Sequence, residues 1–359
     1  AFAMLDRHLL PNFQGGVEAV RQAVRDLLTN PVNFGFVGTS GLRALVRGAS
    51  MTLASREPYN ISAREILRRR YEQVVITDSV TTVPNTAYLL EGHIGSGDST
   101  EVFSGARVGS FHESVVVKVL RALDDEDLMT HEMHVLARLA ASDVKGAYFF
   151  TTLLPRVVAR GLVFDPDRVP RRALVLRNRN GFDWTLADVL KEYREGVEPK
   201  TAVWMWNRLL TLIAWLQNNH IAHSAIVPAH VLINPVTHGA VLLDFKYATP
   251  FGEAPPAIAA SHVGYYPEEI DEGGPVKAST DVEMSARCII AVLGGNPATG
   301  MMPKSVPEEN ANVIYNHAGY TDSTPLFKYA ALELADHFGH AAESVYGPKK
   351  FHPFKMPRR

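Results

Sequence analysis

A chain of 359 residues is long enough for two domains, or for one large two-lobed domain with an extension. Its apolar fraction of 46% and charged fraction of 21% are ordinary for a globular protein. The formal net charge of -2 excludes a general electrostatic attraction to nucleic acids, to membrane surfaces or to acidic partners.

The single cysteine, Cys288, excludes an internal disulfide and a cysteine-based zinc cluster, and it favours a reducing compartment. No apolar run approaches the roughly 20 residues that are needed to span a bilayer. The first residues also lack the basic-then-apolar layout of a signal peptide. We therefore expect a cytoplasmic (intracellular) protein with no membrane segment.

Residues 1–85 predict a helical N-terminal extension. Valine and leucine residues recur at helical spacing within 17–28. Ser62 and Glu65 have the spacing of a capping box, which indicates the start of another helix. The extension therefore differs in its predicted secondary structure from the chain that follows it.

The chain from 86 to 178 predicts a β-rich unit. Short stretches with alternating or β-branched residues are separated by glycine and polar turns, as is typical of strands. A helix carrying Met133, Leu136 and Leu139 interrupts them. The predicted strands are 88–97, 100–108, 113–120, 148–153 and 172–176.

The chain beyond Asp188 predicts mostly helices, among them a long amphipathic helix from Trp204 to Leu216. The last residues, 346–359, combine basic and aromatic side chains. In one reading the phenylalanines of this tail anchor it on the helical part and the charges stay solvated. In the other, the tail docks on an acidic protein or on nucleic acid. The first reading is favoured, so nucleic acid is not the expected partner.

A glycine turn, a strand lysine and a helix glutamate follow one another near the start of the β-rich part. The turn Gly95-Ser96-Gly97 lets the backbone come close to phosphate oxygens, although a plain hairpin has the same glycines. Lys118 then lies at the end of an apolar strand, where a buried ammonium group needs a partner. Glu132 on the next helix can supply that partner.

In this order the features resemble a protein kinase, and the resemblance extends from about Tyr88 to the C-terminus. Thr100 stands where a third glycine of the phosphate-covering loop would be. The resemblance implies an ATP site made of that loop, a lysine–glutamate ion pair and residues near the adenine. These positions are Gly95, Gly97, Val102, Lys118, Glu132 and Leu176.

The segment HIAHSAIVPAHVLINPVTHGAVLLDF, residues 220–245, resembles the kinase motifs H-R-D-x-K-P-x-N and D-F-G. The histidine, the proline and the Asp-Phe pair fall in register. The residues that accept a proton, steady a phosphate and hold a second metal ion are replaced, and Lys246 replaces the last glycine. The retained positions are His223, Pro228, Asp244 and Phe245, and the replaced ones are Ala225, Val227 and His230.

Two downstream positions extend the resemblance. Glu268 in the stretch GYYPEE would end an activation-type segment, and Asp281, in a predicted buried helix, would hold the catalytic loop. The resemblance also implies a Mg²⁺ or Mn²⁺ site at Asp244. His230 can ligate a metal as well, although imidazole suits zinc, manganese or copper better than magnesium.

Ala225 has no proton acceptor, and losing a positioned base typically lowers a rate by about 10²–10⁴. The sequence therefore indicates a pseudokinase that acts as a scaffold or allosteric regulator, binding ATP without phosphoryl transfer, rather than an enzyme. Lys246 can pair with Asp244 and occupy the metal position, or it can replace the missing charge at Val227. The first alternative is favoured.

Other readings stay open. An active, atypical ATP-dependent transferase would use a relocated base, with Asp98 and Asp183 as candidates, and a third possibility is a structural component of a larger assembly. His131 and His134 share a helix face and can chelate a metal, although solvated helix histidines are commoner.

We expect an α+β, two-lobed kinase-like fold with a small β-rich N-lobe and a large helical C-lobe. It is similar to kinase-like proteins that some bacteria and large phages carry, and its partner is expected to be an unidentified protein. The expected divisions are 1–85 for the extension, 86–178 for the N-lobe, 179–345 for the C-lobe and 346–359 for the tail.

Overall fold

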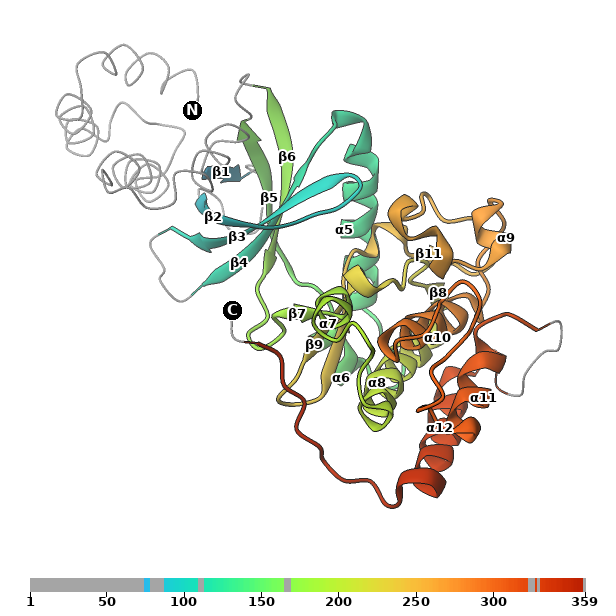
Figure 1. The fold of residues 1–359 in the computed structure, drawn as a ribbon. Helices are drawn as coiled ribbons and strands as arrows, with labels where there is room; N and C mark the ends of the chain where they lie inside the picture. Colours follow the sequence, from blue (N-terminus) through green and yellow to red (C-terminus); the bar gives the residue numbers. More distant parts are fainter. Residues whose placement is uncertain are drawn as a thin grey trace, which may run out of the picture. The chain divides into compact units, whose positions relative to one another are not determined.

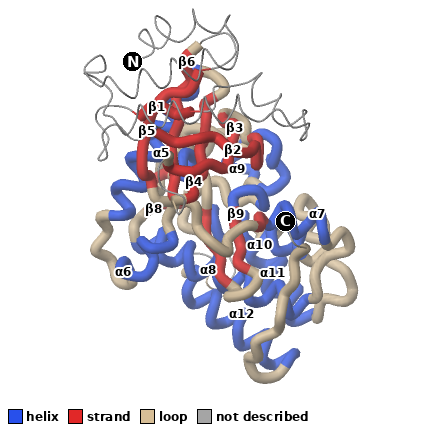
Figure 2. The backbone as a smooth tube through the Cα atoms, turned by 90° about the vertical axis from the view of Figure 1, so that its left-hand side faces the viewer, coloured by secondary structure: helices blue, strands red, loops and turns tan. Residues whose placement is uncertain are grey.

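The protein is described by a computed structural model, which covers residues 74–77, 87–108, 113–164, 169–321, 327 and 330–357. The chain divides into two compact units: the chain up to Glu126 with Arg156–Asn178, and Asp127–Pro155 with Arg179–Arg359. Figure 2 shows strands gathered in the first unit and helices dominating the second. The sequence also predicted a division after Asn178, whereas Asp127–Pro155 was expected in the β-rich lobe.

The first unit is an antiparallel sheet that closes into a barrel in the order β1-β2-β3-β4-β6-β5. Side chains such as Phe103, Val117 and Val175 are fully or almost fully buried in its core. The strands are β1 Val74–Thr77, β2 Ala87–Ser96, β3 Thr100–Arg107, β4 Ser114–Leu120, β5 Val157–Phe164 and β6 Pro170–Arg177.

The predicted strands at the positions of β2, β3, β4 and β6 are confirmed. The expected helical extension, residues 1–85, contains a strand that was not predicted: Val74–Thr77 is β1 and pairs with both β2 and β5. Three of its four residues are β-branched valine or isoleucine and the fourth is threonine, a composition that favours a strand. The rest of the predicted extension, including 17–28, Ser62 and Glu65, lies outside the described residues.

The strand predicted at 148–153 is wrong. These residues form the short helix α6, Ala147–Phe150, followed by the 3-10 turn η4, Thr151–Leu153. Phe150 stacks on Trp215 with ring centroids 5.5 Å apart. An aromatic run can pack in this way from a helical turn as well as from a strand, so an apolar stretch of this length does not define the element.

The second unit is built around helices that pack on one another. Helix α8 packs against both α10 and α12 (Figure 1). The predicted helices at α5, α8 and α10 are confirmed. The helices are α5 Glu126–Ala140, α7 Leu186–Glu192, α8 Pro199–Asn218, α9 Glu268–Asp271, α10 Thr280–Val292, α11 Glu308–His317 and α12 Ala331–Tyr346, together with α6.

Helix α10 forms the centre of this unit, and every one of its residues is buried. Trp206 of α8 donates its indole N–H to the hydroxyl of Ser285 at 2.9 Å. The ring of Trp206 also meets the ring of Phe338 from α12 edge-on, with centroids 4.6 Å apart. Within the described residues, no helix combines the length and the apolar character that crossing a membrane requires.

Short strands frame the segment between α8 and α10. The hairpin of β9, Val231–Asn234, and β10, Gly239–Leu242, pairs with β7, Trp184–Thr185. A second pair joins β8, Ile221–Ala222, to β11, Thr249–Pro250. Both pairs fix the ends of the segment that resembles a kinase catalytic loop.

Candidate functional site

In the first unit, three of the residues predicted for nucleotide binding lie in one row across the sheet. Gly95 of β2 pairs with Val102 of β3, Val102 pairs with Lys118 of β4, and Lys118 pairs with Leu174 of β6. Directly paired residues on neighbouring strands point to the same face of a sheet. Leu176 also belongs to β6 and is buried there. The sheet therefore brings these predicted side chains onto one surface.

The space beside the two glycines of the β2–β3 turn is open. A Cβ on Gly95 would meet no atom of the structure within 4 Å, and on Gly97 the nearest atom would be the hydroxyl of Thr100 at 3.5 Å. The turn is closed by the amide of Gly97, which donates to the carbonyl of Thr100 at 2.8 Å. This turn does not need glycine for its own packing, so the open space suits a ligand that contacts the backbone.

Lys118 and Glu132, the predicted ion pair, are both buried, with exposed fractions of 6% and 1%. Glu132 is carried by α5, most of which belongs to the second unit. The neighbouring His131 donates its Nε2–H to the carbonyl of Ala248 at 2.8 Å, which ties α5 to the segment after Lys246.

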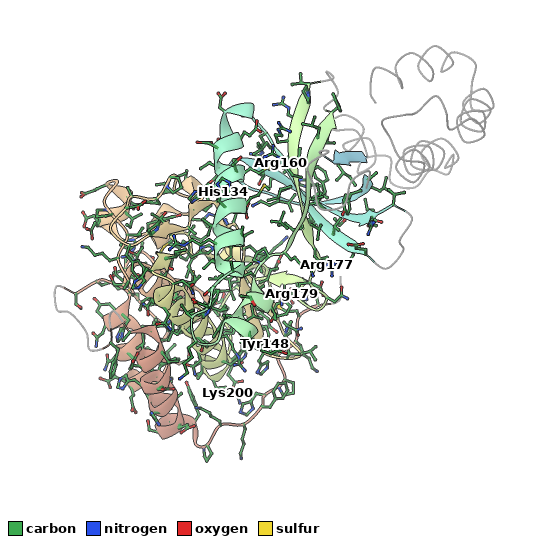
Figure 3. All side chains as sticks on the ribbon, turned by 180° about the vertical axis from the view of Figure 1, so that it is seen from behind. His134, Tyr148, Arg160, Arg177, Arg179 and Lys200 are labelled. Carbon is green, nitrogen blue, oxygen red and sulfur yellow. The ribbon has the colours of Figure 1, made fainter. Side chains whose placement is uncertain are left out.

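His134, labelled in Figure 3, is exposed. Across the part of the chain that the structure describes, no three His, Cys, Asp or Glu side chains gather as metal ligands would. The two candidates for a relocated base, Asp98 and Asp183, are both exposed.

In the second unit, the carboxylate of Asp281 holds the segment that resembles a catalytic loop. Its two oxygens accept the backbone N–H of His223 at 2.6 Å and of Ser224 at 2.9 Å. Ser224 has a φ of 62°, a left-handed conformation that a serine keeps only when its surroundings hold it. Burial raises the pKa of Asp281 to about 6, against the lowering effect of the two backbone donors.

The loop itself is packed into the core. Ala225, Ile226 and Val227 each have an exposed fraction of 0%. Beneath them, the thiol of Cys288 donates to the carbonyl of Ile226 at 3.3 Å, and burial raises the pKa of that thiol. The two positions where a kinase carries a charged aspartate and lysine are thus filled by methyl groups in a dry environment.

His223 connects the loop to the end of β10. Its Nε2 lies 2.8 Å from the carbonyl oxygen of Leu243, to which it donates, and its ring meets Phe245 edge-on at 4.8 Å. The amide of Leu243 in turn donates to the carbonyl of His230 at 2.8 Å. These contacts place Asp244 beside His230.

The side chains of His230, Asp244 and Lys246 form a polar cluster. One carboxylate oxygen of Asp244, Oδ2, lies 3.2 Å from Nε2 of His230 and 3.4 Å from Nζ of Lys246. The Lys246 side chain is only 2% exposed, and its ammonium group also lies 4.9 Å from the ring centre of Tyr247. The structure therefore brings together the three residues that the sequence linked to a metal position.

The protonation of His230 follows from its partners. Its Nδ1 lies 2.9 Å from the carbonyl of Ala225, which can only accept, so this nitrogen carries a proton. Burial lowers the pKa of His230, opposed by the charge of Asp244 and the bond to Ala225, and Lys246 and His262 lower it further. The Lys246 ammonium group supplies a positive charge beside Asp244.

This cluster does not fit a divalent metal ion. Magnesium binds carboxylate oxygens at about 2.0–2.1 Å, with near-ideal octahedral geometry. The Lys246 ammonium group, 3.4 Å from Asp244 Oδ2, is a positive charge beside the same oxygen and would repel such an ion. One of the two carboxylate oxygens of Asp244, Oδ2, therefore already lies beside a cation of the chain.

Two further residues of the second unit bear on the sequence-based expectation. Glu268, predicted to have a structural role, is exposed at the start of α9. The buried Arg287 of α10, which the sequence analysis did not single out, donates to the carbonyls of Tyr266 and Ala318 and lies 5.1 Å from the ring centre of Tyr320. An arginine inside an apolar helix was the available signal, because a buried guanidinium needs partners.

No model of a protein family matches this chain, and no curated protein matches its sequence. Among solved structures, the chain is similar to a rhoptry kinase from Toxoplasma gondii, with 14% sequence identity and a TM-score of 0.57. The similarity covers 76% of this chain and 84% of that chain. At this level of identity the likeness shows the fold, and the chain has an α+β protein kinase-like fold.

Proposed function

We propose that this protein is a pseudokinase that acts as a scaffold or allosteric regulator and does not transfer phosphate. The observation that carries the proposal is the ion pair between Lys246 and Asp244, in which Nζ and Oδ2 are 3.4 Å apart. Because Lys246 is 2% exposed, water screens this pair little. In a kinase the aspartate at this position binds the metal ion that neutralises the transferred phosphate.

The loop supports the same conclusion. Phosphoryl transfer depends on positioning and on charge stabilisation. Ala225 and Val227, fully buried, supply neither a proton acceptor nor a positive charge. The candidates for a relocated base, Asp98 and Asp183, are exposed.

We also propose that the protein binds ATP without a divalent metal ion. The row of Gly95, Val102 and Lys118, with open space at the β2–β3 turn, supports a nucleotide site in the first unit. The Asp244–Lys246 pair in the second unit supports metal independence.

Calorimetric titration of ATP, with and without Mg²⁺, tests both proposals on the full chain. For the wild type we expect saturable binding whose affinity changes less than about twofold when Mg²⁺ is added. Lys246→Gly frees Asp244, so its affinity should rise at least tenfold with Mg²⁺. Lys304→Gly, at an exposed lysine, is the matched control and should behave as the wild type.

The alternatives predict other outcomes. Release or transfer of phosphate by the wild type, lost in Lys118→Ala, would identify an active transferase and refute the pseudokinase. No binding of ATP under any condition would refute the nucleotide site and favour a structural component. Equal Mg²⁺ dependence in the wild type and in Lys246→Gly would refute the role given to Lys246.

A further inference from the structure

The C-terminal tail returns along the second unit after α12 ends. Residues 347–357 contain neither helix nor strand. Gly347, with a φ of 78°, turns the chain away from the helix. Figure 1 shows the tail leaving the lower end of α12 and running back toward β7 and β9, and Figure 2 shows its end beside β9. An extended segment without backbone pairing must be held by its side chains.

Phe351 takes part in a stack of three rings. It lies over His238, with centroids 4.3 Å apart and planes at 22°. His238 lies on Trp204 of α8 at 4.4 Å and 7°. His238 occupies the turn between β9 and β10, so the tail covers the tip of the hairpin whose strands lead from His230 to Asp244.

Phe354 makes the second attachment. Its ring lies 5.3 Å from the ring of Tyr193 and 6.2 Å from that of Trp204. The hydroxyl of Tyr193 donates to the carbonyl of Lys355 at 2.5 Å, which fixes the backbone beside the ring. The two phenylalanines of the sequence Phe-x-x-Phe thus engage a surface formed by Tyr193, Trp204 and His238.

The tail is an incomplete match for this surface. Phe351 keeps 63% of its area exposed. His238 bonds to the backbone of His352 through one ring nitrogen, but its Nε2 and the Nε1 of Trp204 are buried and have no partner among the described residues. A buried polar atom without a partner costs stability. A segment that supplied partners to these two atoms would therefore bind more tightly than the tail does.

We propose that Tyr193, Trp204 and His238 form a binding site for an extended Phe-x-x-Phe segment of a partner protein. The chain's own tail fills this site and competes with that partner. The chain supplies its own segment at a high effective concentration, of the order of millimolar for a short linker. A partner segment binds when it makes the polar contacts that the tail lacks, and it then releases the tail.

Limited trypsin digestion of the full chain tests whether the tail occupies the site. Cleavage after Lys350 and Lys355 is followed by mass spectrometry. In the double variant Phe351→Ala and Phe354→Ala, cleavage should be at least tenfold faster than in the wild type. Lys349→Gln, which removes only an exposed ion pair to Glu343, should stay within twofold. Equal cleavage in the wild type and the double variant would overturn the proposal.

The same digestion tests whether the site accepts a segment from outside. The probe is a synthetic peptide of residues 347–357 in which glutamine replaces each lysine, so that trypsin does not cut it. Added at millimolar concentration, it should accelerate cleavage of the wild-type tail at least fivefold. A peptide with alanine in place of both phenylalanines is the control. An effect of both peptides, or of neither, would overturn the proposal.

Discussion

Asp281 makes the stability of the second unit depend on pH in a direction that the structure fixes. Its carboxylate is 2% exposed and accepts two backbone N–H groups, from His223 and Ser224. Burial raises its pKa from 3.8 to about 6. The folded chain therefore binds this proton more tightly than the unfolded chain, and stability should fall as the pH rises through about 6.

The magnitude follows from the two pKa values. A rise from 3.8 to about 6 corresponds to about 3 kcal/mol, at about 1.36 kcal/mol for each pH unit. Asp281→Asn removes this titration, because an amide gains no proton in the range. The free energy of unfolding of the wild type minus that of the variant should therefore decrease by about 3 kcal/mol from below pH 4 to about pH 8.

Urea unfolding at a series of pH values measures this difference by linear extrapolation. Asp336→Asn, at an exposed position, is the control, and its difference from the wild type should stay flat. A difference between wild type and Asp281→Asn that grows with pH would refute the reasoning. It would mean that the two backbone donors stabilise the ionised carboxylate by more than burial destabilises it.

Three further substitutions test contacts by urea unfolding at neutral pH. Arg287→Leu should lower the free energy of unfolding by about 3 kcal/mol, because two buried carbonyls lose a charged donor; a loss below about 1 kcal/mol would contradict this. His131→Ala should lower the free energy of unfolding by about 1 kcal/mol, because the hydrogen bond to the carbonyl of Ala248 is lost. The control His134→Ala, at an exposed position, should lower it by less than about 0.5 kcal/mol. Equal losses in the two variants would count against the bond from His131. Thr185→Ala should cost about 1 kcal/mol, since Thr185 and Asp188 form a capping box, and an unchanged midpoint would show that the cap is dispensable.

Much of the fold could be predicted from the local pattern of apolar residues in the sequence. The β-branched run at β4 and the long amphipathic stretch of α8 each satisfy one periodicity clearly, and both were predicted. Strand β5 was not, because Arg160 and Gly161 interrupt its apolar alternation and its pairing with β6 decides its conformation. The helix α6 was mistaken for a strand because Phe150 gains its place from Trp215, far away in the sequence.

The candidate site, like the fold, could be predicted only in part from the sequence. The sequence directly contains the apolar residues at Ala225 and Val227 and the lysine at 246. It does not contain distances, so only the structure places Lys246 beside Asp244 and separates it from solvent. Arg287 was missed for a related reason, since its acceptors are backbone carbonyls, which leave no trace in the residue types.

The apolar residues of the loop pack together in the core. Ala225, Ile226 and Val227 are fully buried over Cys288, so restoring aspartate at Ala225 alone would bury a carboxylate without a partner. Such a group keeps its proton rather than ionise, and a protonated carboxyl cannot act as a base. In our proposal, then, the loss of catalysis is not one missing residue. The backbone anchor at Asp281 is kept because it holds the loop, while the positions that would serve chemistry have become part of the core.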